Sequence, residues 1–402
     1  MQHRVRVLQG GKALWPIKIR SAAAREDADL ESGFEQRPGS ARDVAVAGEQ
    51  EAFHSRYFMH TVTIQPAGHR FQVEDGESVL TAALRNGFVL PYGCKDGACG
   101  SCKGKIIAGT VDYGHYHLRV LTDAERAHGK ALFCQAKPLS ELVIEVRTVS
   151  TLQGIEIKML PCRVQTIDKR APDVAVLTLK LPANQRLKYL AGQYIDFLLK
   201  DGARRSFSMA NPPHKDESIE LHIRHVPGGG FTERVFNQMK EREILRFEGP
   251  HGSFFLREDS PKPIVLVASG TGFAPIKAIL EDAFHRNVSR PMTFYWGGRR
   301  PRDLYLHELP LKWAAEQRNF RYVPVISDAL PEDAWGGRTG FVHLAVMQDF
   351  ADLSAHQVYA CGVPVMVEAA QRDFIAQRGL PEDEFFCDSF TTQADLAAEE
   401  QR

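Results

Sequence analysis

Four cysteines crowd into one stretch of the sequence with the spacing of an iron ligand set. Cys94, Cys99 and Cys102 follow the pattern C-x4-C-x2-C, and Cys134 completes the set further along the chain. This spacing is typical of plant-type 2Fe-2S sites, in which four thiolates hold a cluster with a reduction potential of about −400 mV. The pattern therefore predicts a one-electron carrier.

The residues between these cysteines are small. A tight loop must point three sulfurs inward, and the intervening residues keep side chains out of the way and leave amide N–H groups free to bond the sulfurs. They are Gly93, Gly97, Ala98, Gly100 and Ser101. A structural zinc site, which usually takes paired C-x2-C units, and simple buried cysteines are the alternatives.

A second set of residues would suit a flavin nucleotide. Arg205 offers a fork of donors to a phosphate, Phe207 offers a flat face beside the flavin ring, and the Ser208 hydroxyl could bond the reactive flavin nitrogen. Alone, this motif also fits an ordinary strand end.

A glycine run about 20 residues further on supplies the matching phosphate contact. Gly229 and Gly230 would let the backbone approach a phosphate at a helix start, and Thr232 can donate a hydroxyl. Alone, the run also fits an ordinary loop.

A third set of residues would suit a dinucleotide. The continuous apolar run over 264–268 predicts a parallel strand buried on both faces, followed by Gly270, Thr271 and Gly272 and a helix over 276–284. Strand, glycine turn and helix form the pyrophosphate site of a Rossmann-like unit. Pro275 stands where the third glycine of the usual motif would be.

Short strand patterns predict the elements that position these groups. Strands at 61–65 and 69–73 and a helix from Ser78 to Asn86 flank the cysteine loop. Strands at 174–179, 194–199 and 219–223 indicate a small antiparallel barrel, and strands at 292–296, 320–325 and 357–360 complete an α/β pattern. These elements predict domains over 59–148, 150–255 and 256–395.

Composition sets the remaining limits. The 402 residues carry fifty Lys+Arg and fifty Asp+Glu, so no net charge favours nucleic acid, and no apolar run is long enough to span a membrane. Residues 1–58 lack periodicity and a targeting pattern, which predicts a disordered extension or a chain that really starts at Met59. We therefore expect a cytoplasmic protein.

The order of these motifs resembles the ferredoxin–NADP reductase superfamily, in particular the three-domain reductases with an N-terminal plant-type ferredoxin. These include reductase components of bacterial oxygenases and the CDP-6-deoxy-3,4-glucoseen reductase type, which Ser208 to Asn211 resembles most. The resemblance implies a β-grasp ferredoxin, an antiparallel β-barrel flavin domain and a Rossmann-like nicotinamide domain. It also favours FAD over FMN.

The resemblance adds further site residues. Cys361 and Gly362 match a turn beside the nicotinamide, and Phe390 matches an aromatic ring near the flavin, although a core position fits Phe390 equally well. Cys162 and Cys387 are expected to be structural. NADH and NADPH both remain open, since three arginines near a predicted strand end could pair with a 2′-phosphate or form a solvated loop: Arg299, Arg300 and Arg302.

Electron counting joins the three parts. A nicotinamide gives up two electrons as a hydride, a 2Fe-2S cluster accepts one, and a flavin can divide the pair. We therefore predict an NAD(P)H-dependent reductase that passes electrons through FAD and the cluster to an acceptor protein, an oxygenase or a CDP-deoxysugar dehydrase. No acid–base catalytic residue is expected. A non-catalytic redox sensor and a permanently docked electron-transfer subunit are the alternatives.

Overall fold

The computed structural model of the chain describes residues 59–146 and 154–391. The extension predicted for residues 1–58 lies outside these ranges. So do the last residues of the first predicted domain, the first residues of the second, and residues 392–395 of the third.

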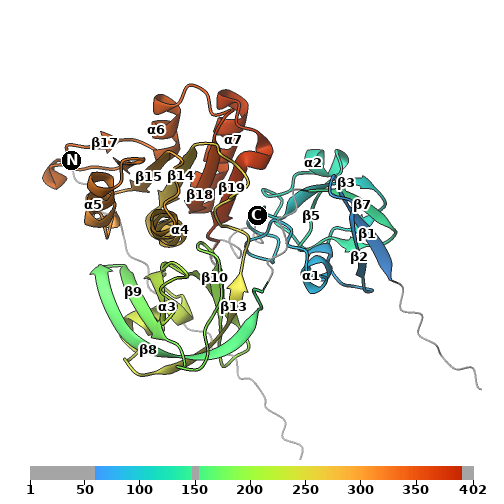
Figure 1. The fold of residues 1–402 in the computed structure, drawn as a ribbon, viewed down its shortest axis with the longest axis horizontal. Helices are drawn as coiled ribbons and strands as arrows, with labels where there is room; N and C mark the ends of the chain where they lie inside the picture. Colours follow the sequence, from blue (N-terminus) through green and yellow to red (C-terminus); the bar gives the residue numbers. More distant parts are fainter. Residues whose placement is uncertain (1–58, 147–153, 392–402) are drawn as a thin grey trace, which may run out of the picture. The chain divides into compact units, whose positions relative to one another are not determined.

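The first part of the described chain is a five-stranded mixed sheet in the order β2-β1-β7-β3-β5 (Figure 1). β1 pairs antiparallel with β2 and parallel with β7. A sheet of this kind with one packed helix is the predicted β-grasp arrangement. The strands are β1 (His60–Gln65), β2 (His69–Val73), β3 (Lys103–Ala108), β5 (Lys130–Leu132) and β7 (Leu142–Glu145), with the ribbon β4 (Val111–Asp112) and β6 (Lys137–Pro138) and the helices α1 (Val79–Arg85) and α2 (Asp123–Ala127).

Helix α1 begins and ends where the sequence predicts. The Ser78 hydroxyl accepts from the Thr81 amide at 3.2 Å, which satisfies one free N–H group of the first turn. Gly87 follows the last turn with φ of 80°, a conformation that glycine adopts without steric cost. The helix buries Val79, Leu80 and Ala83 in the core of this part.

The second part is an antiparallel sheet in the order β11-β10-β13-β8-β9-β12. A bridge between Met209 and Leu221 joins the chain just after β11 to β12, so the two edges of the sheet meet as in the predicted barrel. The elements are β8 (Lys158–Ala171), β9 (Val174–Lys180), β10 (Tyr194–Leu198), β11 (Arg204–Ser208), β12 (Ser218–Arg224), β13 (Ile244–His251) and the helix α3 (Gly230–Asn237).

The third part is a fully parallel sheet in the order β17-β16-β15-β14-β18-β19. The strands are β14 (Ile264–Ser269), β15 (Met292–Gly298), β16 (Phe320–Ile326), β17 (Arg338–Thr339), β18 (Gln357–Gly362) and β19 (Phe385–Ser389). The helices are α4 (Phe273–His285), α5 (Glu308–Glu316), α6 (Val342–Asp349) and α7 (Pro364–Arg378).

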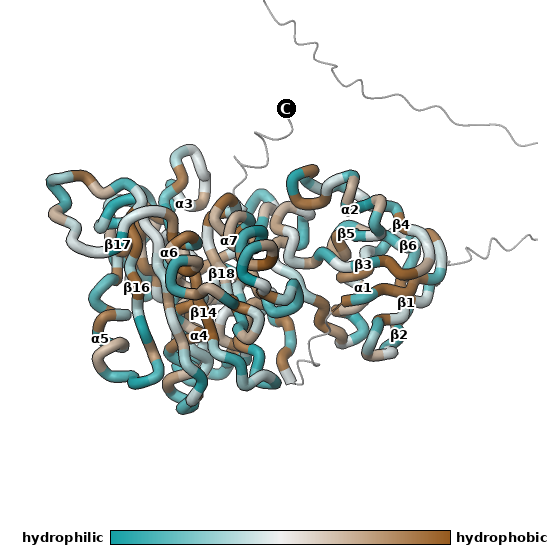
Figure 2. Tube along the Cα trace, turned by 90° about the horizontal axis from the view of Figure 1, so that it is seen from above, coloured by the Kyte–Doolittle hydropathy of each residue, from teal (hydrophilic) through white to brown (hydrophobic). Residues whose placement is uncertain are grey.

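Helices cover both faces of this parallel sheet. Ile264 and Leu266 of β14 pack in a core with α4, while Val265 and Val267 pack in a second core with α6 and α7. Both faces are therefore apolar, and Figure 2 shows β14 as a hydrophobic stretch. This explains why the strand over 264–268 reads as a continuous apolar run.

Candidate functional site

The four clustered cysteines come together at one end of the ferredoxin-like part. The Cys94 amide lies 3.4 Å from the Cys99 sulfur. The thiols form two hydrogen-bonded pairs: the bond between Cys94 and Cys99 lowers the pKa of Cys99 and raises that of Cys94, and the bond between Cys102 and Cys134 lowers the pKa of Cys134 and raises that of Cys102. The four sulfurs therefore lie close enough to share protons in pairs, and metal would bind their thiolate forms. All seven cysteines are free of disulfides.

Glycines close the cysteine loop. Gly97 has φ of 79°, and a Cβ there would lie 2.7 Å from the carbonyl oxygen of His115. A Cβ at Gly93 would lie 3.2 Å from the Cys99 sulfur and 3.3 Å from Asp388 Oδ1. The thiolate set and the absence of space for side chains around it fit the predicted 2Fe-2S cluster.

The predicted flavin residues lie on β11 and at the start of α3. Phe207 is half-buried, and its ring centroid lies 5.4 Å from that of Phe231. The Ser208 hydroxyl is 3.5 Å from Asp388 Oδ2. Arg205 is half-exposed and its Nη1 donates to the carbonyl oxygen of Arg204 at 2.7 Å.

The glycine run has the predicted helix start. Gly229 is the N-cap of α3, and the position a Cβ would take at Gly230 has no atom within 4 Å, which leaves the backbone open to a ligand. The Thr232 hydroxyl accepts from the Val226 amide at 3.1 Å. Thr232 therefore shapes this turn.

The two predicted nicotinamide turns interlock. Gly270, Thr271 and Gly272 form a single 3-10 turn between β14 and α4. A Cβ at Gly272 would lie 2.2 Å from the carbonyl oxygen of Cys361, and Gly362 has φ of 138° against Ser269. The sequence motifs, which lie about 90 residues apart in the chain, thus form one edge at the carboxyl ends of neighbouring parallel strands, where such folds bind ligands.

Arg224 at the end of β12 is a candidate that the sequence analysis missed. A Cβ at Gly270 would lie 2.8 Å from Arg224 Nη1, so the guanidinium faces the nicotinamide turn. Its Nη2 is buried without a hydrogen-bond partner among the described residues, and its Nε lies 3.1 Å from Asp173 Oδ2. A half-buried guanidinium with a buried nitrogen that has no hydrogen-bond partner among the described residues fits the pyrophosphate of a dinucleotide. The sequence signal for Arg224 was its position four residues before Gly228, which begins the glycine run.

The last strand brings the cluster loop and the flavin residues together. Asp388 on β19 is buried between Ser208 and Gly93, and burial, with the nearby Cys99, raises the pKa of its carboxyl to about 7. The Ser101 hydroxyl donates to the carbonyl oxygen of Cys387 at 3.2 Å. The Phe390 amide donates to Gly362 at 2.8 Å, so the predicted aromatic residue follows this strand directly.

The arginines near the end of β15 differ in their surroundings. Arg300 is paired with Asp333 through two hydrogen bonds of 2.6 and 2.9 Å and also contacts Glu332. Arg299 and Arg302 are exposed. Only these two offer an uncommitted surface for a 2′-phosphate.

Comparison with known families accounts for each part of the chain. Residues 62–139 match the 2Fe-2S iron-sulfur cluster binding domain, residues 161–256 the oxidoreductase FAD-binding domain, and residues 266–372 the oxidoreductase NAD-binding domain.

Known proteins share the whole arrangement. The chain is 42% identical over 329 residues to the CDP-6-deoxy-L-threo-D-glycero-4-hexulose-3-dehydrase reductase of Yersinia pestis, covering 82% of this chain and 98% of the relative. It is 38% identical to component 2 of the terephthalate 1,2-dioxygenase reductase of a Comamonas species, covering 83% and 98%. The crystal structure of an Amycolatopsis cytochrome P450 reductase superposes with a TM-score of 0.67 at 34% identity, covering 83% and 99%.

The chain belongs to this family of iron–sulfur flavoprotein reductases. The reductase is an NAD(P)H-dependent oxidoreductase that passes electrons through FAD and a 2Fe-2S cluster to a partner enzyme. This confirms the predicted resemblance, cofactors and fold class. No helix among residues 59–146 and 154–391 of the reductase has the length and hydrophobicity to cross a membrane.

The protein's own contribution to this chemistry is placement. Bound flavin would supply the two-electron to one-electron conversion. The interlocked turns at Gly272 and Cys361 would hold the nicotinamide, and Ser208, with Asp388 beside it, would face the flavin. Ser101 and Gly93 then bring the cysteine loop against the strand that carries Asp388.

Proposed function

We propose that the electron acceptor of the reductase is a CDP-6-deoxyhexulose 3-dehydrase. The observation that carries this proposal is the 42% identity to a dehydrase reductase over 98% of its length, against 38% and 36% for reductase components that serve a dioxygenase and a phenol monooxygenase. We further propose a cytoplasmic location, which suits a nucleotide-sugar substrate and free thiol ligands.

We also propose the individual cofactor contacts and the domain limits 59–148, 150–255 and 256–395. The positions of the motifs on β11, α3, β14 and β18 support them. The proposed cluster ligands are Cys94, Cys99, Cys102 and Cys134; the proposed flavin contacts are Arg205, Phe207, Ser208, Gly229, Gly230, Thr232 and Phe390; the proposed nicotinamide contacts are Gly270, Thr271, Gly272, Cys361 and Gly362.

The test combines two measurements on the purified holoprotein. Under anaerobic conditions NADH or NADPH should bleach first the flavin and then the cluster absorbance. The reduced protein should then support turnover of a purified Yersinia dehydrase with its CDP-sugar substrate. Bleaching without dehydrase turnover would contradict the proposed partner.

An oxygenase is the second candidate partner. The similarity to the Amycolatopsis cytochrome P450 reductase, which covers 83% of the chain, favours it. Turnover of a P450 or a Rieske dioxygenase, with none of the dehydrase, would identify this class. Reduction with no turnover even of cytochrome c would instead indicate the non-catalytic sensor.

A further inference from the structure

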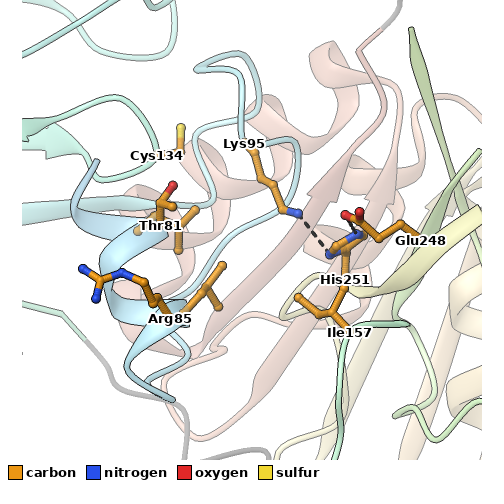
Figure 3. Close-up of a pocket in the computed structure, with 9 residues that line it drawn as sticks. Thr81, Arg85, Lys95, Cys134, Ile157, Glu248 and His251 are labelled. Carbon is orange, nitrogen blue, oxygen red and sulfur yellow. Dashed lines mark hydrogen bonds and ion pairs between the residues drawn. The ribbon is translucent and has the colours of Figure 1, made fainter. Parts of the chain in front are cut away.

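One lysine of the cysteine loop, also called the cluster loop below, reaches the end of a strand of the flavin barrel. Lys95 lies directly between the ligand Cys94 and Asp96, and its Nζ is 3.0 Å from His251 Nδ1 at the end of β13. Figure 3 shows the side chain reaching from the loop towards His251, beside a cavity of about 350 Å³ that α1 borders on the other side. The contact joins positions 156 residues apart.

His251 is a buried acceptor. It is 1% exposed, and its Nε2 lies 3.2 Å from Glu248 Oε1 and 3.5 Å from Asp196 Oδ2. Because a lysine ammonium has only donors, Nδ1 accepts and Nε2 carries the hydrogen. Burial and the charge of Lys95 lower the pKa of His251 to about 4, so its ring is neutral at pH 7 and free to accept.

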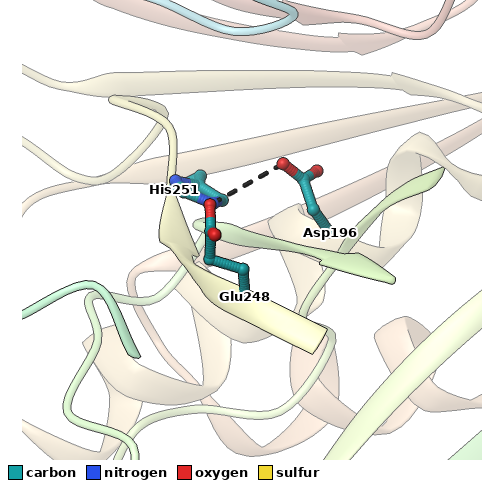
Figure 4. A group of neighbouring side chains, drawn as sticks. All are labelled: Asp196, Glu248 and His251. Atoms are coloured by element: carbon teal, nitrogen blue, oxygen red, sulfur yellow. Dashed lines mark ion pairs between the residues drawn. The ribbon is translucent and has the colours of Figure 1, made fainter. Parts of the chain in front are cut away.

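The same group of side chains, Asp196, Glu248 and His251, resembles a metal site (Figure 4), since their ligand atoms lie within 4.8 Å of one another. The charges, however, are already matched. Arg204 holds Glu248 through bonds of 2.7 and 3.1 Å, and the Ser206 hydroxyl donates to Asp196 at 2.6 Å. With Lys95 on the remaining ring nitrogen, two cations face two carboxylates. The three side chains Asp196, Glu248 and His251 thus form a receptor for the ammonium group of Lys95.

Hydrogen bonds of neighbouring backbone groups also hold the cysteine loop against the flavin barrel. The Tyr92 amide donates to the Ser253 hydroxyl at 2.7 Å, and the Ser253 amide donates to the carbonyl oxygen of Tyr92 at 3.1 Å. The Tyr194 hydroxyl donates to the carbonyl oxygen of Gly93 at 2.7 Å. Lys95 itself has φ of 68°, a conformation that a residue with a side chain keeps only where its surroundings hold it.

We propose that Lys95 is a positioning residue for electron transfer from flavin to cluster. Its ammonium, seated in the receptor formed by Asp196, Glu248 and His251, fixes the Cys94 side of the cluster loop against the flavin barrel. The inference rests on the function stated above and adds a residue to it. No atom is transferred in this step: one electron leaves the reduced flavin and enters the cluster, and Lys95 determines only the distance.

The first experiment compares Lys95→Met with the wild type as full-length holoprotein. In anaerobic stopped-flow mixing with NADH, we expect flavin bleaching at the wild-type rate and cluster bleaching slowed by about tenfold or more, because small displacements cost large factors in rate. Lys95→Arg, which keeps the cation, should recover most of the rate. Lys105→Met, which removes an exposed lysine of β3 in the same ferredoxin-like part, is the control and should behave as wild type.

A second readout does not depend on turnover. Hydrogen–deuterium exchange should become faster at the Tyr92 and Ser253 amides of Lys95→Met, and should be unchanged in Lys105→Met. The midpoint potential of the cluster, from a redox titration, should stay at its wild-type value. Unchanged amide exchange, or a potential shift large enough to explain the slower rate, would overturn the positioning role.

The receptor side gives an independent variant if Lys95→Met fails to fold. His251→Phe keeps a ring but removes the acceptor, and it should slow cluster bleaching to the same extent. The double variant should be no slower than either single variant, and additive losses would refute the contact. If the wild-type flavin itself does not bleach, the function is wrong; if both bleaching steps of Lys95→Met match the wild type, only the role of Lys95 is wrong.

Discussion

At the scale of single residues, Gly97 shows how little freedom the cluster loop has. Its φ of 79° disfavours any side chain, and a Cβ would lie 2.7 Å from a backbone oxygen that cannot rotate away. We expect Gly97→Ala to cost about 2 kcal/mol or more in loop stability and to lower the cluster content measured by iron analysis and visible absorbance.

Gly76 provides the matched control. Its φ of 73° is nearly the same, but a Cβ there would have no atom within 4 Å. Gly76→Ala should therefore cost only about 1 kcal/mol and keep the cluster. Equal cluster contents in the two variants would contradict the steric explanation.

Arg300 leads to a prediction about coenzyme choice. Its guanidinium already forms two hydrogen bonds with Asp333, so it is not available to a 2′-phosphate. We expect Arg300→Ala to change the ratio of kcat/KM for NADPH and NADH by no more than about twofold. Steady-state ferricyanide assays with both coenzymes would check this. A tenfold change in the ratio would show that the ion pair between Arg300 and Asp333 opens when the coenzyme binds.

The residues that the sequence could identify are those with local signals. The four cysteines could be predicted from their spacing, and the glycine turns could be predicted from the strand and helix patterns next to them in the chain. The contacts that Lys95, Arg224 and Asp388 make have no such local signal, because the residues that they contact lie far away in sequence. Ser208 and Asp388, for example, are 180 positions apart.

At the scale of elements, a buried charge group fastens β12 to α4. The Glu220 carboxylate accepts from His222 Nε2 at 2.9 Å and lies 3.2 Å from Lys277 Nζ. Burial opposes ionisation of Glu220, but the hydrogen bond from His222 and the charge of Lys277 outweigh it and lower the pKa of this carboxyl from 4.5 to about 2. Its ionised form therefore stabilises the fold.

This pKa fixes the direction of a pH effect. Because the folded value is depressed, the stabilisation is complete above pH 4.5 and is lost as the pH falls towards 2. Glu220→Gln should lower the free energy of unfolding at pH 7 by at most about 3 kcal/mol. The difference from wild type in urea titrations should shrink between pH 5 and pH 3, since protonated Glu and Gln are alike in charge. A constant difference over this range would contradict the assignment.

Some elements could be predicted from the sequence and others, among them β19, could not. Strand β14 and helix α1 could be predicted because their signals lie within the segment itself. For β14 the signal is a continuous apolar run, and for α1 it is a capping residue at the start. β19 is short and lies at the edge of its sheet, and its register makes sense only beside β18. The sequence analysis therefore named Phe390 after this strand but did not predict the strand itself.

At the scale of the whole molecule, the hydride-accepting parts and the cluster part should be separable in function. The nicotinamide turns and the flavin residues lie on or beside β11, α3, β14 and β18, in parts of the chain that contain none of the four cluster cysteines. We expect Cys99→Ser to lose the cluster and to lower cytochrome c reduction by about a hundredfold, while NADH-dependent ferricyanide reduction stays within about twofold.

Lys105→Met again serves as a control for general damage to the ferredoxin-like part. Loss of both activities in Cys99→Ser, with flavin content intact, would show that the cluster part supports hydride transfer after all. Flavin content from absorbance after heat release separates this outcome from simple unfolding.

Domain order was predictable because each part carries its own motif, whereas the contacts between parts were not. Motifs report what each part binds, and no local rule relates Lys95 to His251 or Ser101 to Cys387. The structure supplies these contacts, which are hydrogen bonds from the cysteine loop to β13 and β19.

The bond between Ser101 and Cys387 also has a consequence for how the protein is made. It spans 286 positions, so the cysteine loop leaves the ribosome long before the strand that will meet it. The connection of the cysteine loop to the third part of the molecule therefore waits until β19 has been synthesised. A chain released before Cys387 would lack the hydrogen bond that joins this loop to β19.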